Sequence, residues 1–435
     1  MNRNVSLTDI ALREVLATRA RNIDGSELAG DVLAAIATIP QRPLWPFRFA
    51  RPKSLMPILV GLVLLPAALI GAALIGAQVR RDAGADVIAY TEAQLRWSGG
   101  VAADSAAIMR VDVGDGSPTH LVDVSATLYA GGSYARVGPA VKWSPDGSRI
   151  AFRSDGLYVM NRDGSDLRLI AEAVDEGERA GANDRTSSFA WSPDSSRIAF
   201  ISPNKMAWPP GSAPNGRLWV VDVESGALQP LADAANGSVS WSPDGSRVAF
   251  GRSRQWTSDV VILTTANSEE LSYRFDGEGV SHPGAIAWSP DGSLVAFDQT
   301  RFGADREGEY LMVLNSRATE AREITHVELS GCCYHGAFGG LLAWSPDGSL
   351  LAKPHWTDDG VRIRVIAADG SGIRSEFRGD WFDWSPDGSQ LVFSAPGPTI
   401  VGAPSHYRSS SIFISNVDGT GSRWIADGDY PAWSP

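Results

Sequence analysis

A ten-residue motif that recurs along the chain constrains this sequence more than any other feature. The segment "WSPDGSRIAF" begins at Trp143, and variants of it follow at spacings of 40 to 56 residues. Repeats of this length indicate a propeller or a similar array, because a small unit buries its apolar surface only against its neighbours. The Trp-Ser-Pro triplet at the head of the motif occurs at Trp143, Trp191, Trp241, Trp288, Trp344, Trp384 and Trp433.

Each repeat predicts four short strands. The first ends at the Trp, and the second alternates as in "RIAF". The third is apolar, as in "LYVMN" from Leu157, and the fourth is short, as in "LRLIA" from Leu167. In the S-P-D-G turn, Pro presets a type I turn and Gly takes the left-handed position. Ser195 replaces this Gly in one repeat, so it must either adopt the left-handed conformation or belong to another turn. Segments such as "NRDGSD" from Asn161 predict a second hairpin between the third and fourth strands.

The two ends of the repeat region complement each other. The sequence closes with "PAWSP", which supplies only the first strand of a repeat. Near the other end, "DVIAYT" from Asp86 and "AIMRVDVGDGSPTHLV" from Ala107 supply a second, third and fourth strand. Pairing of these ends would complete one sheet and close a ring. We therefore predict an all-β protein with a seven-bladed β-propeller, and a six-bladed propeller is the alternative if the ends do not pair.

The motif W-S-P-D-G-S-x-[IVL]-A-F, followed by D-G hairpins, resembles the repeat of TolB-type propellers, which are relatives of WD-repeat proteins. The resemblance covers residues 84–435, and it departs at Ser195 and at Lys353, which stands where other repeats have Phe. It implies a propeller fold that binds proteins. TolB has six blades and an extra N-terminal domain in the periplasm, whereas this sequence has an apolar segment in place of that domain.

Residues 55–79, "LMPILVGLVLLPAALIGAALIGAQV", contain no charged side chain. A helix of this length crosses a hydrocarbon core of about 30 Å. A buried core helix is the alternative, which the charged residues on both sides disfavour. Four basic residues between positions 42 and 53 precede the segment and two follow it, so the positive-inside rule predicts a cytoplasmic N-terminus.

We accordingly expect three parts: a cytoplasmic helical tail over residues 1–54, a transmembrane helix over 55–79 and a TolB-like propeller over 84–435. The chain would be a single-pass protein of the cell membrane with an extracytoplasmic propeller. Amphipathic segments that follow Ser6 and Ser26 predict two short helices in the tail. These helices either pair with each other or contact a cytoplasmic protein partner.

Charge and cysteine content exclude several classes of function. Of the formal net charge of −12, residues 1–81 contribute +5 from ten basic and five acidic residues, which leaves −17 for the remainder. So acidic a domain lacks the Lys and Arg that nucleic acid requires. Cys332 and Cys333 are adjacent, and we expect two free thiols rather than a strained ring disulfide. The segment "HVELSGCCYH" has metal-ligand residue types, but adjacent cysteines do not easily bind one tetrahedral ion. We therefore predict neither a metal nor a cofactor.

The connections between second and third strands, and between a fourth strand and the next first strand, are long and irregular. In a propeller both kinds lie on one face, and variable loops on a rigid scaffold are the usual place of binding. We therefore assign the repeated Trp residues to the scaffold and the irregular loops to recognition. Aromatic and Arg side chains carry most of the binding energy at interfaces. With the histidines, the candidate binding residues are Trp208, Arg301, His326, Tyr334, His335, Phe338, His406, Tyr407 and Arg408.

The leading hypothesis is a membrane-anchored, non-catalytic propeller that binds a protein or cell-envelope ligand outside the membrane. The first alternative is a transmembrane sensor, similar in layout to anti-sigma regulators, that relays binding to a cytoplasmic partner. The second is a hydrolase or lyase with its site at the propeller mouth. Propellers of this repeat type occur fused to prolyl oligopeptidase-class peptidases, but the sequence contains no G-x-S-x-G motif for such a domain. We therefore expect no enzymatic activity.

Overall fold

Antiparallel β-strands build the part of the chain that the computed structural model describes. That part comprises residues 86–97, 101–114, 116–124, 128–131, 134–137, 140–154, 156–172, 189–202, 216–254, 257–275, 283–301, 307–328, 341–357, 360–399 and 408–435. It belongs to one compact unit and contains strands and turns but no helix. The predicted tail and transmembrane helix lie outside these residues, and none of the described segments could span a membrane as a helix.

Three of the sheets have four consecutive strands each, in the order that the repeat predicts. The first contains β6 (Val141–Trp143), β7 (Arg149–Arg153), β8 (Gly156–Asn161) and β9 (Arg168–Glu172). The second contains β17 (Ile286–Trp288), β18 (Leu294–Arg301), β19 (Gly308–Asn315) and β20 (Ala321–Glu328). The third contains β21 (Ala343–Trp344), β22 (Leu350–Thr357), β23 (Gly360–Ala367) and β24 (Ile373–Arg378).

Two larger sheets extend this pattern. The seven-stranded sheet joins two repeats, and its strands are β10 (Phe189–Trp191), β11 (Arg197–Ser202), β12 (Gly216–Asp222), β13 (Leu228–Trp241), β14 (Arg247–Arg254), β15 (Thr257–Thr264) and β16 (Glu270–Phe275). The strand β13 is both the fourth strand of one repeat and the first strand of the next. The other sheet contains β25 (Trp381–Trp384), β26 (Gln390–Thr399), β27 (Arg408–Asn416) and β28 (Arg423–Asp427), and the hairpin of β4 (Leu128–Gly131) and β5 (Tyr134–Val137) joins it at β27.

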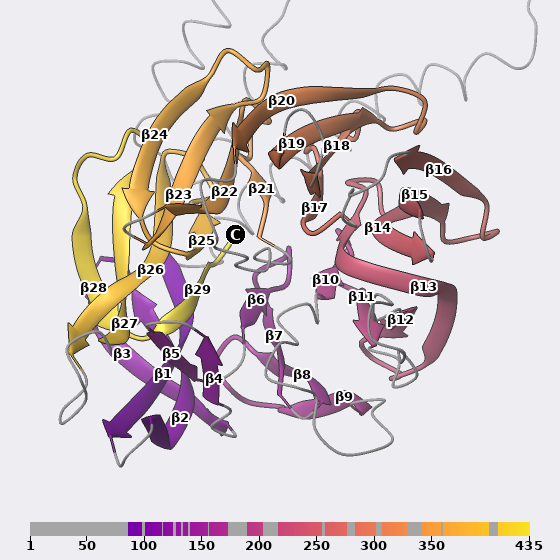
Figure 1. Cartoon of the computed structure of the whole chain (residues 1–435). Coiled ribbons are helices and arrows are strands. Elements are labelled where there is room, and N and C mark those ends of the chain that lie inside the picture. The colour runs from indigo at the N-terminus through magenta and orange to yellow at the C-terminus, as the bar shows by residue number, and fades with distance from the viewer. Residues whose placement is uncertain are drawn as a thin grey trace, which may run out of the picture. The chain divides into compact units, whose positions relative to one another are not determined.

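The remaining sheet joins the two ends of the repeat region, as predicted. Its strand order is β29 (Asp429–Trp433), β1 (Val87–Trp97), β2 (Val101–Asp112) and β3 (Pro118–Val124), shown in yellow and indigo in Figure 1. Ile88 pairs with Trp433, and Ala89 pairs with Ala432. The last strand of the chain therefore completes the sheet that the first strands begin.

The S-P-D-G turns have the predicted backbone. Gly147 has a φ of 68°, and the glycines at the same position of four other repeats have φ between 70° and 73°. Ser195 has a φ of 60°, so it accepts the left-handed conformation and keeps the same turn. The turns are also stabilised by their side chains: Ser242 and Ser246 donate hydrogen bonds to Asp244, and these bonds lower the pKa of Asp244 to about 2.

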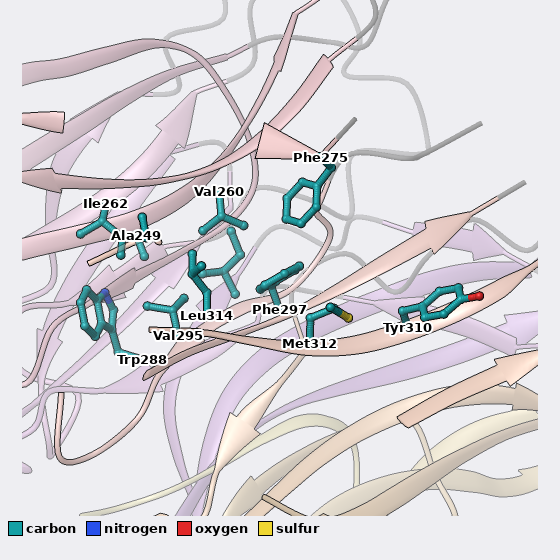
Figure 2. Packing of buried hydrophobic residues seen from close by; sticks show 12 residues of the cluster. Ala249, Val260, Ile262, Phe275, Trp288, Val295, Phe297, Tyr310, Met312 and Leu314 are labelled. Atoms are coloured by element: carbon teal, nitrogen blue, oxygen red, sulfur yellow. The ribbon is translucent and has the colours of Figure 1, made fainter. Parts of the chain in front are cut away.

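Buried apolar clusters lie between neighbouring repeats. In the cluster of Figure 2, Val260 and Ile262 of β15 pack against Trp288 of β17 and Phe297 of β18. Phe297 occupies the last position of the "RIAF" type of segment and contacts the preceding repeat. Because each sheet covers the apolar surface of its neighbour, the repeats form one continuous core.

The Trp side chains connect the first strands of successive repeats. Five indoles donate a hydrogen bond to the carbonyl of the residue that precedes the Trp of the repeat before: Trp143 to Ala432, Trp191 to Lys142, Trp241 to Ala190, Trp344 to Ala287 and Trp384 to Ala343. In the other two repeats a side chain accepts a hydrogen bond from the backbone of the next Trp. Ser240 accepts one from the backbone N–H of Trp288, and Asp383 accepts one from the backbone N–H of Trp433. These bonds lead from repeat to repeat and return from Trp143 to the last strand of the chain.

Replacement of Trp433 by Ala tests the importance of the closing strand. Trp433 is buried and packs between β1 and β27. We expect Trp433→Ala to lower the free energy of unfolding by about 3–5 kcal/mol, as for other buried Trp residues. Urea denaturation of the full chain measures this change. The control is Trp424→Ala, whose side chain is 57% exposed and whose loss should cost less than about 0.5 kcal/mol. Equal effects of the two changes would contradict the closing role of β29.

A pH dependence follows from the link between Asp383 and Trp433. Burial raises the pKa of Asp383 to about 6, so the folded protein binds this proton more tightly than the unfolded chain does. The stability that Asp383 contributes is therefore highest at low pH, and up to about 3 kcal/mol is lost as the pH rises from about 4 through 6. The variant Asp383→Ser copies Ser240, which keeps an acceptor without a charge, and should remove this slope from urea denaturation curves. A slope that persists in the variant would assign the pH dependence to another group.

Candidate binding face

The sheets have two chemically different ends. We call the end with the S-P-D-G turns and the hairpins between third and fourth strands the turn end. We call the opposite end the loop end: there the second strand leads to the third, and the fourth strand leads to the next repeat. Arg301 at the end of β18 and Gly308 at the start of β19 pair with each other at the loop end.

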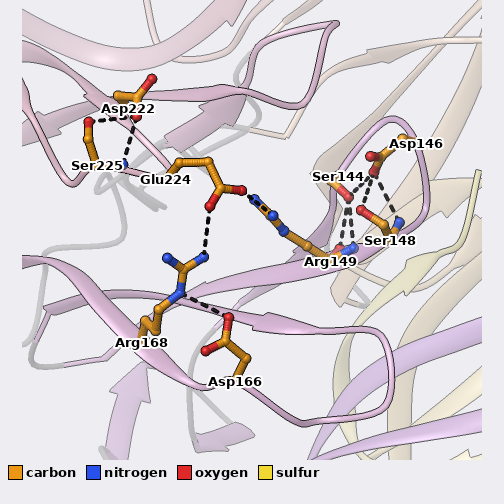
Figure 3. Close-up of polar contacts among 9 residues, drawn as sticks. All are labelled: Ser144, Asp146, Ser148, Arg149, Asp166, Arg168, Asp222, Glu224 and Ser225. Atoms are coloured by element: carbon orange, nitrogen blue, oxygen red, sulfur yellow. Dashed lines mark hydrogen bonds and ion pairs between the residues drawn. The ribbon is translucent and has the colours of Figure 1, made fainter.

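Polar groups at the turn end bind one another locally. Asp146 accepts hydrogen bonds from the side chains of Ser144 and Ser148 (Figure 3). Equivalent Ser and Asp residues make the same bonds in the five other repeats with a complete motif. Glu224 forms ion pairs with Arg149 and Arg168, which links two neighbouring repeats. The repeated Asp residues are thus occupied by scaffold contacts.

Buried charged and polar side chains gather in the loop half of the sheets instead. Arg252 donates two hydrogen bonds of 2.7 Å to Glu270, and Asp259 pairs with Arg274 at 3.2 Å. Lys, Arg and Asp are seldom buried in proteins unless they are paired. The buried members of this layer are Arg252, Asp259, Gln299, Lys353, His355, Asp380 and Asp429. The strand ends that carry the loops of the loop end therefore contain buried polar contacts. These contacts differ between repeats and do not follow from the repeat motif.

Lys353 shows how one of these contacts arises. It replaces the Phe of the other repeats, and its ammonium group meets two carboxylates of the preceding repeat. Lys353 Nζ lies 3.4 Å from Glu309 Oε2 and 3.6 Å from Asp298 Oδ2. Asp298 also accepts hydrogen bonds from the backbone N–H groups of Gly284 and Ala285, at the start of β17. A buried cation has thus taken the place of an apolar contact, and two acids balance it.

The two acids determine the protonation of this cluster. Burial alone would lower the pKa of Lys353, but Glu309 and Asp298 outweigh burial and raise it. Burial raises the pKa of Asp298, and Lys353 only partly offsets that effect. Lys353 therefore stays charged, while a single ammonium group cannot fully neutralise two partly buried carboxylates.

Two of the predicted binding residues, Arg301 and His326, contact the same side chain, that of Tyr310. The guanidinium carbon of Arg301 lies 4.3 Å from the ring centroid of Tyr310. The ring of His326 stacks on the same Tyr310, with 5.2 Å between centroids and 27° between planes. Both residues belong to strand ends rather than to loops, since Arg301 ends β18 and His326 lies in β20.

Of the other predicted binding residues, only Arg408 lies among the described residues. Arg408 was expected in a loop, but it is the first residue of β27 and pairs with Thr399. This correction arises because the pairing of β26 and β27 extends further toward the loop end than the Pro and Gly residues between 396 and 403 suggest. Outside the described residues lie Trp208, Tyr334, His335, Phe338, His406 and Tyr407.

Sequence patterns did not identify every polar residue of the loop end. Gln299 of β18 and Tyr310 of β19 lie within predicted strands, and the sequence patterns did not single them out. Lys353 was recognisable as an exception to the repeat, and a search for nearby acids in the preceding repeat would have found Asp298 and Glu309. Within the described part of the chain, no group of three or more His, Cys, Asp or Glu residues could hold a metal ion.

Comparison with known proteins bears on the fold. No family model and no curated protein matches this sequence. A puromycin-hydrolyzing peptidase of Mycobacterium tuberculosis is similar with a TM-score of 0.53 and 16% identity over 79% of this chain and 52% of that one. The acylaminoacyl peptidase of Pyrococcus horikoshii gives a TM-score of 0.51 and 14% identity over 79% of this chain and 51% of that one. This chain thus spans about half the length of each peptidase.

TolB, whose repeat this sequence resembles, is among the similar structures. The protein from Acinetobacter baumannii is 15% identical over 80% of this chain and 83% of that chain, with a TM-score of 0.42. The likeness to the two peptidases supports the fold, and together with the antiparallel sheets it is consistent with a β-propeller. Identities of this order give no information on activity.

Removal of the Lys353 charge should make stability depend on pH. Lys353→Met leaves the partly buried Asp298 and Glu309 without their cation, so we expect a loss of about 3 kcal/mol at pH 7. Burial then raises the pKa of Asp298 without the offsetting charge of Lys353, so stability should recover as the pH falls toward about 4. Urea denaturation at pH 7 and pH 5 measures both effects.

The control restores the ordinary repeat. A triple variant with Lys353→Phe, Asp298→Ala and Glu309→Gln replaces the charged cluster by neutral groups and should show no recovery at pH 5. An equal stability of Lys353→Met at both pH values would mean that the acids are not buried against the lysine.

Proposed function

We propose that this chain is a seven-bladed β-propeller that binds a protein or cell-envelope ligand through its loop end without catalysing a reaction. The hydrogen bonds between successive first strands support seven blades, because they pass through seven repeats before they return to Trp143. In this reading the seven-stranded sheet consists of two blades that share β13.

The observation that carries the binding proposal is the difference between the two ends of the sheets. At the turn end, the same Ser and Asp residues satisfy one another in repeat after repeat, and little distinguishes one repeat from the next. At the loop end, several repeats have their own ion pair or hydrogen bond around a buried side chain, as at Ser202, Arg252 and His355. Recognition requires a surface whose residues differ from place to place, so we place it at the loop end.

The membrane anchor and the topology belong to the same proposal. Residues 55–79 would cross the membrane once, with residues 1–54 in the cytoplasm and the propeller outside. The tail is then the part available to a cytoplasmic partner, and signalling through it is the alternative to simple anchoring. An enzyme is the third possibility, because two similar structures with TM-scores above 0.5 are named as peptidases. Their activities are not transferred to this chain, which has no G-x-S-x-G motif.

Photocrosslinking in intact cells tests which end binds. A photoreactive amino acid at Trp208, Tyr334 or Tyr407 should give crosslinked partners, because all three belong to loop-end connections. The controls carry the same amino acid at Asp163 and Glu224, which are exposed at the turn end, and these should give none. Crosslinks from the turn-end positions alone would contradict the proposal.

A further inference from the structure

Four side chains form one row at the loop end, and we call them the Gln299 site. Gln299 of β18 pairs with Tyr310 of β19, which in turn pairs with His326 of β20. Arg301 lies two residues after Gln299 and so on the same face of the sheet. This face is turned toward the sheet that contains β14–β16, and Figure 2 shows Tyr310 at the end of the shared cluster opposite Trp288.

Gln299 is a buried side chain whose hydrogen-bonding capacity is unused. It is 2% exposed, and neither its Nε2 nor its Oε1 has a hydrogen-bond partner in the described part of the chain. A carboxamide can donate two hydrogen bonds and accept two. Leaving such a group unsatisfied in the interior is unfavourable, so Gln299 lacks, among the described residues, a contact that it needs.

The equivalent residues of other repeats have the partners that Gln299 lacks. Each lies two positions after the end of the "RIAF" type of segment. Ser202 accepts a hydrogen bond of 3.1 Å from the indole of Trp219. Arg252 donates to Glu270, and His355 lies 3.1 Å from Glu376. The position therefore tolerates a buried polar group when a neighbouring strand supplies its partner, and at Gln299 no described strand does.

Arg301, two residues further along, also has no counter-ion within the described part of the chain. Its guanidinium lies on the ring of Tyr310, and its buried Nε has no hydrogen-bond partner among the described residues. Arg149, Arg217 and Arg252 by contrast each pair with a carboxylate. The cross-strand partner of Arg301 is Gly308, where a Cβ atom would lie 2.4 Å from the carbonyl oxygen of Val327. The position opposite Arg301 on β19 therefore has no room for a side chain that could cover the guanidinium.

We propose that the Gln299 site binds a carboxylate of a peptide. Arg301 would donate to the carboxylate as a planar fork, which is the geometry that guanidinium groups favour. Gln299 would donate through Nε2 to the same carboxylate and accept a peptide N–H at Oε1. This inference deepens the proposed function, on which it rests, because it names the chemistry that the loop end recognises.

The two groups together favour a peptide over an acidic sugar. A carboxamide matches a peptide unit, since each has one N–H donor group and one carbonyl acceptor. The carboxylate of an Asp, a Glu or a chain terminus is also carried on a narrow stem, which can reach a group that is nearly enclosed. The carboxylate of a uronic acid is attached directly to a bulky ring. The peptide carboxylate can come from a side chain or from the C-terminus, and the experiment separates the two.

A stability measurement tests the site without any ligand. In the purified full chain, Gln299→Leu removes the unsatisfied amide, so the midpoint of thermal unfolding should stay the same or rise. The matched variant is His355→Leu at the equivalent position, where a partnered side chain is lost and the midpoint should fall. A fall for Gln299→Leu as well would show that Gln299 is satisfied internally, including by a bound water, and would overturn the proposal.

A binding measurement tests the chemistry. Fluorescent hexapeptide pools are made with Asp and Glu but an amidated terminus, with a free C-terminus but no Asp or Glu, and with neither. We expect the wild-type chain to bind the first or the second pool, which identifies the source of the carboxylate, and to bind the third at least tenfold more weakly. Arg301→Gln should weaken binding at least tenfold, and Gln299→Glu should do the same, because it supplies a carboxylate to Arg301 within the protein. The control Arg322→Gln changes an exposed residue at the turn end and should leave binding unchanged.

The outcomes separate this proposal from the broader one. If all three pools bind equally or none binds, the peptide-carboxylate site is wrong, even if crosslinking shows a partner at the loop end. Binding of alginate that Arg301→Gln abolishes, without binding of either carboxylate pool, would replace the peptide by an acidic polysaccharide. Crosslinks at the turn end alone would instead contradict the proposed function, whatever the pools show.

Discussion

The pairing of the last strand with the first strands is the constraint on which the rest of the structure depends. A sheet has two broad faces. One is covered by the preceding repeat and the other by the following repeat. A linear stack of such units would leave one apolar face exposed at either end and would need special terminal units. Here Trp433 pairs with Ile88 across almost the whole chain, and the indole of Trp143 binds the carbonyl of Ala432. The closed cycle thus removes both ends at the entropic cost of one long loop, which grows only slowly with length.

Features that depend on a single repeat were predictable from the sequence. The S-P-D-G turn is decided by four neighbouring residues, so its strands and its left-handed Gly positions follow from the sequence. Even Ser195 obeys the motif, because four hydrogen-bonded residues around it, Ser192, Asp194, Ser196 and Arg197, fix the turn more strongly than its own conformational preference. The same is true of the joined ends, whose missing strands could be counted before the structure was known.

Features that depend on a neighbouring repeat were not predictable in the same way. Ser268 and Ala318 adopt positive φ in two hairpins without the Gly that marks the others. The pairing of β13 with both β12 and β14 joins two repeats through a strand that no single-repeat pattern requires. The sequence did not single out Gln299, because its lack of a partner among the described residues can be recognised only in three dimensions. Local rules therefore gave the scaffold, whereas the candidate site depends on contacts between strands that are distant in sequence.

The charge of the chain after residue 81 determines how such a site can select a ligand. A net charge of −17 after residue 81 repels acidic molecules over long range, although salt screens this repulsion beyond roughly 8 Å at physiological ionic strength. Arg301 therefore cannot attract an acidic peptide from a distance, and it acts only on a carboxylate already at contact. A nucleic acid or another dense polyanion meets the whole negative surface, but a peptide with one well-placed carboxylate meets mainly the guanidinium and the carboxamide. The negative surface thus repels polyanions, while Arg301 and Gln299 attract a single carboxylate. Together these two effects favour the peptide over other negatively charged ligands.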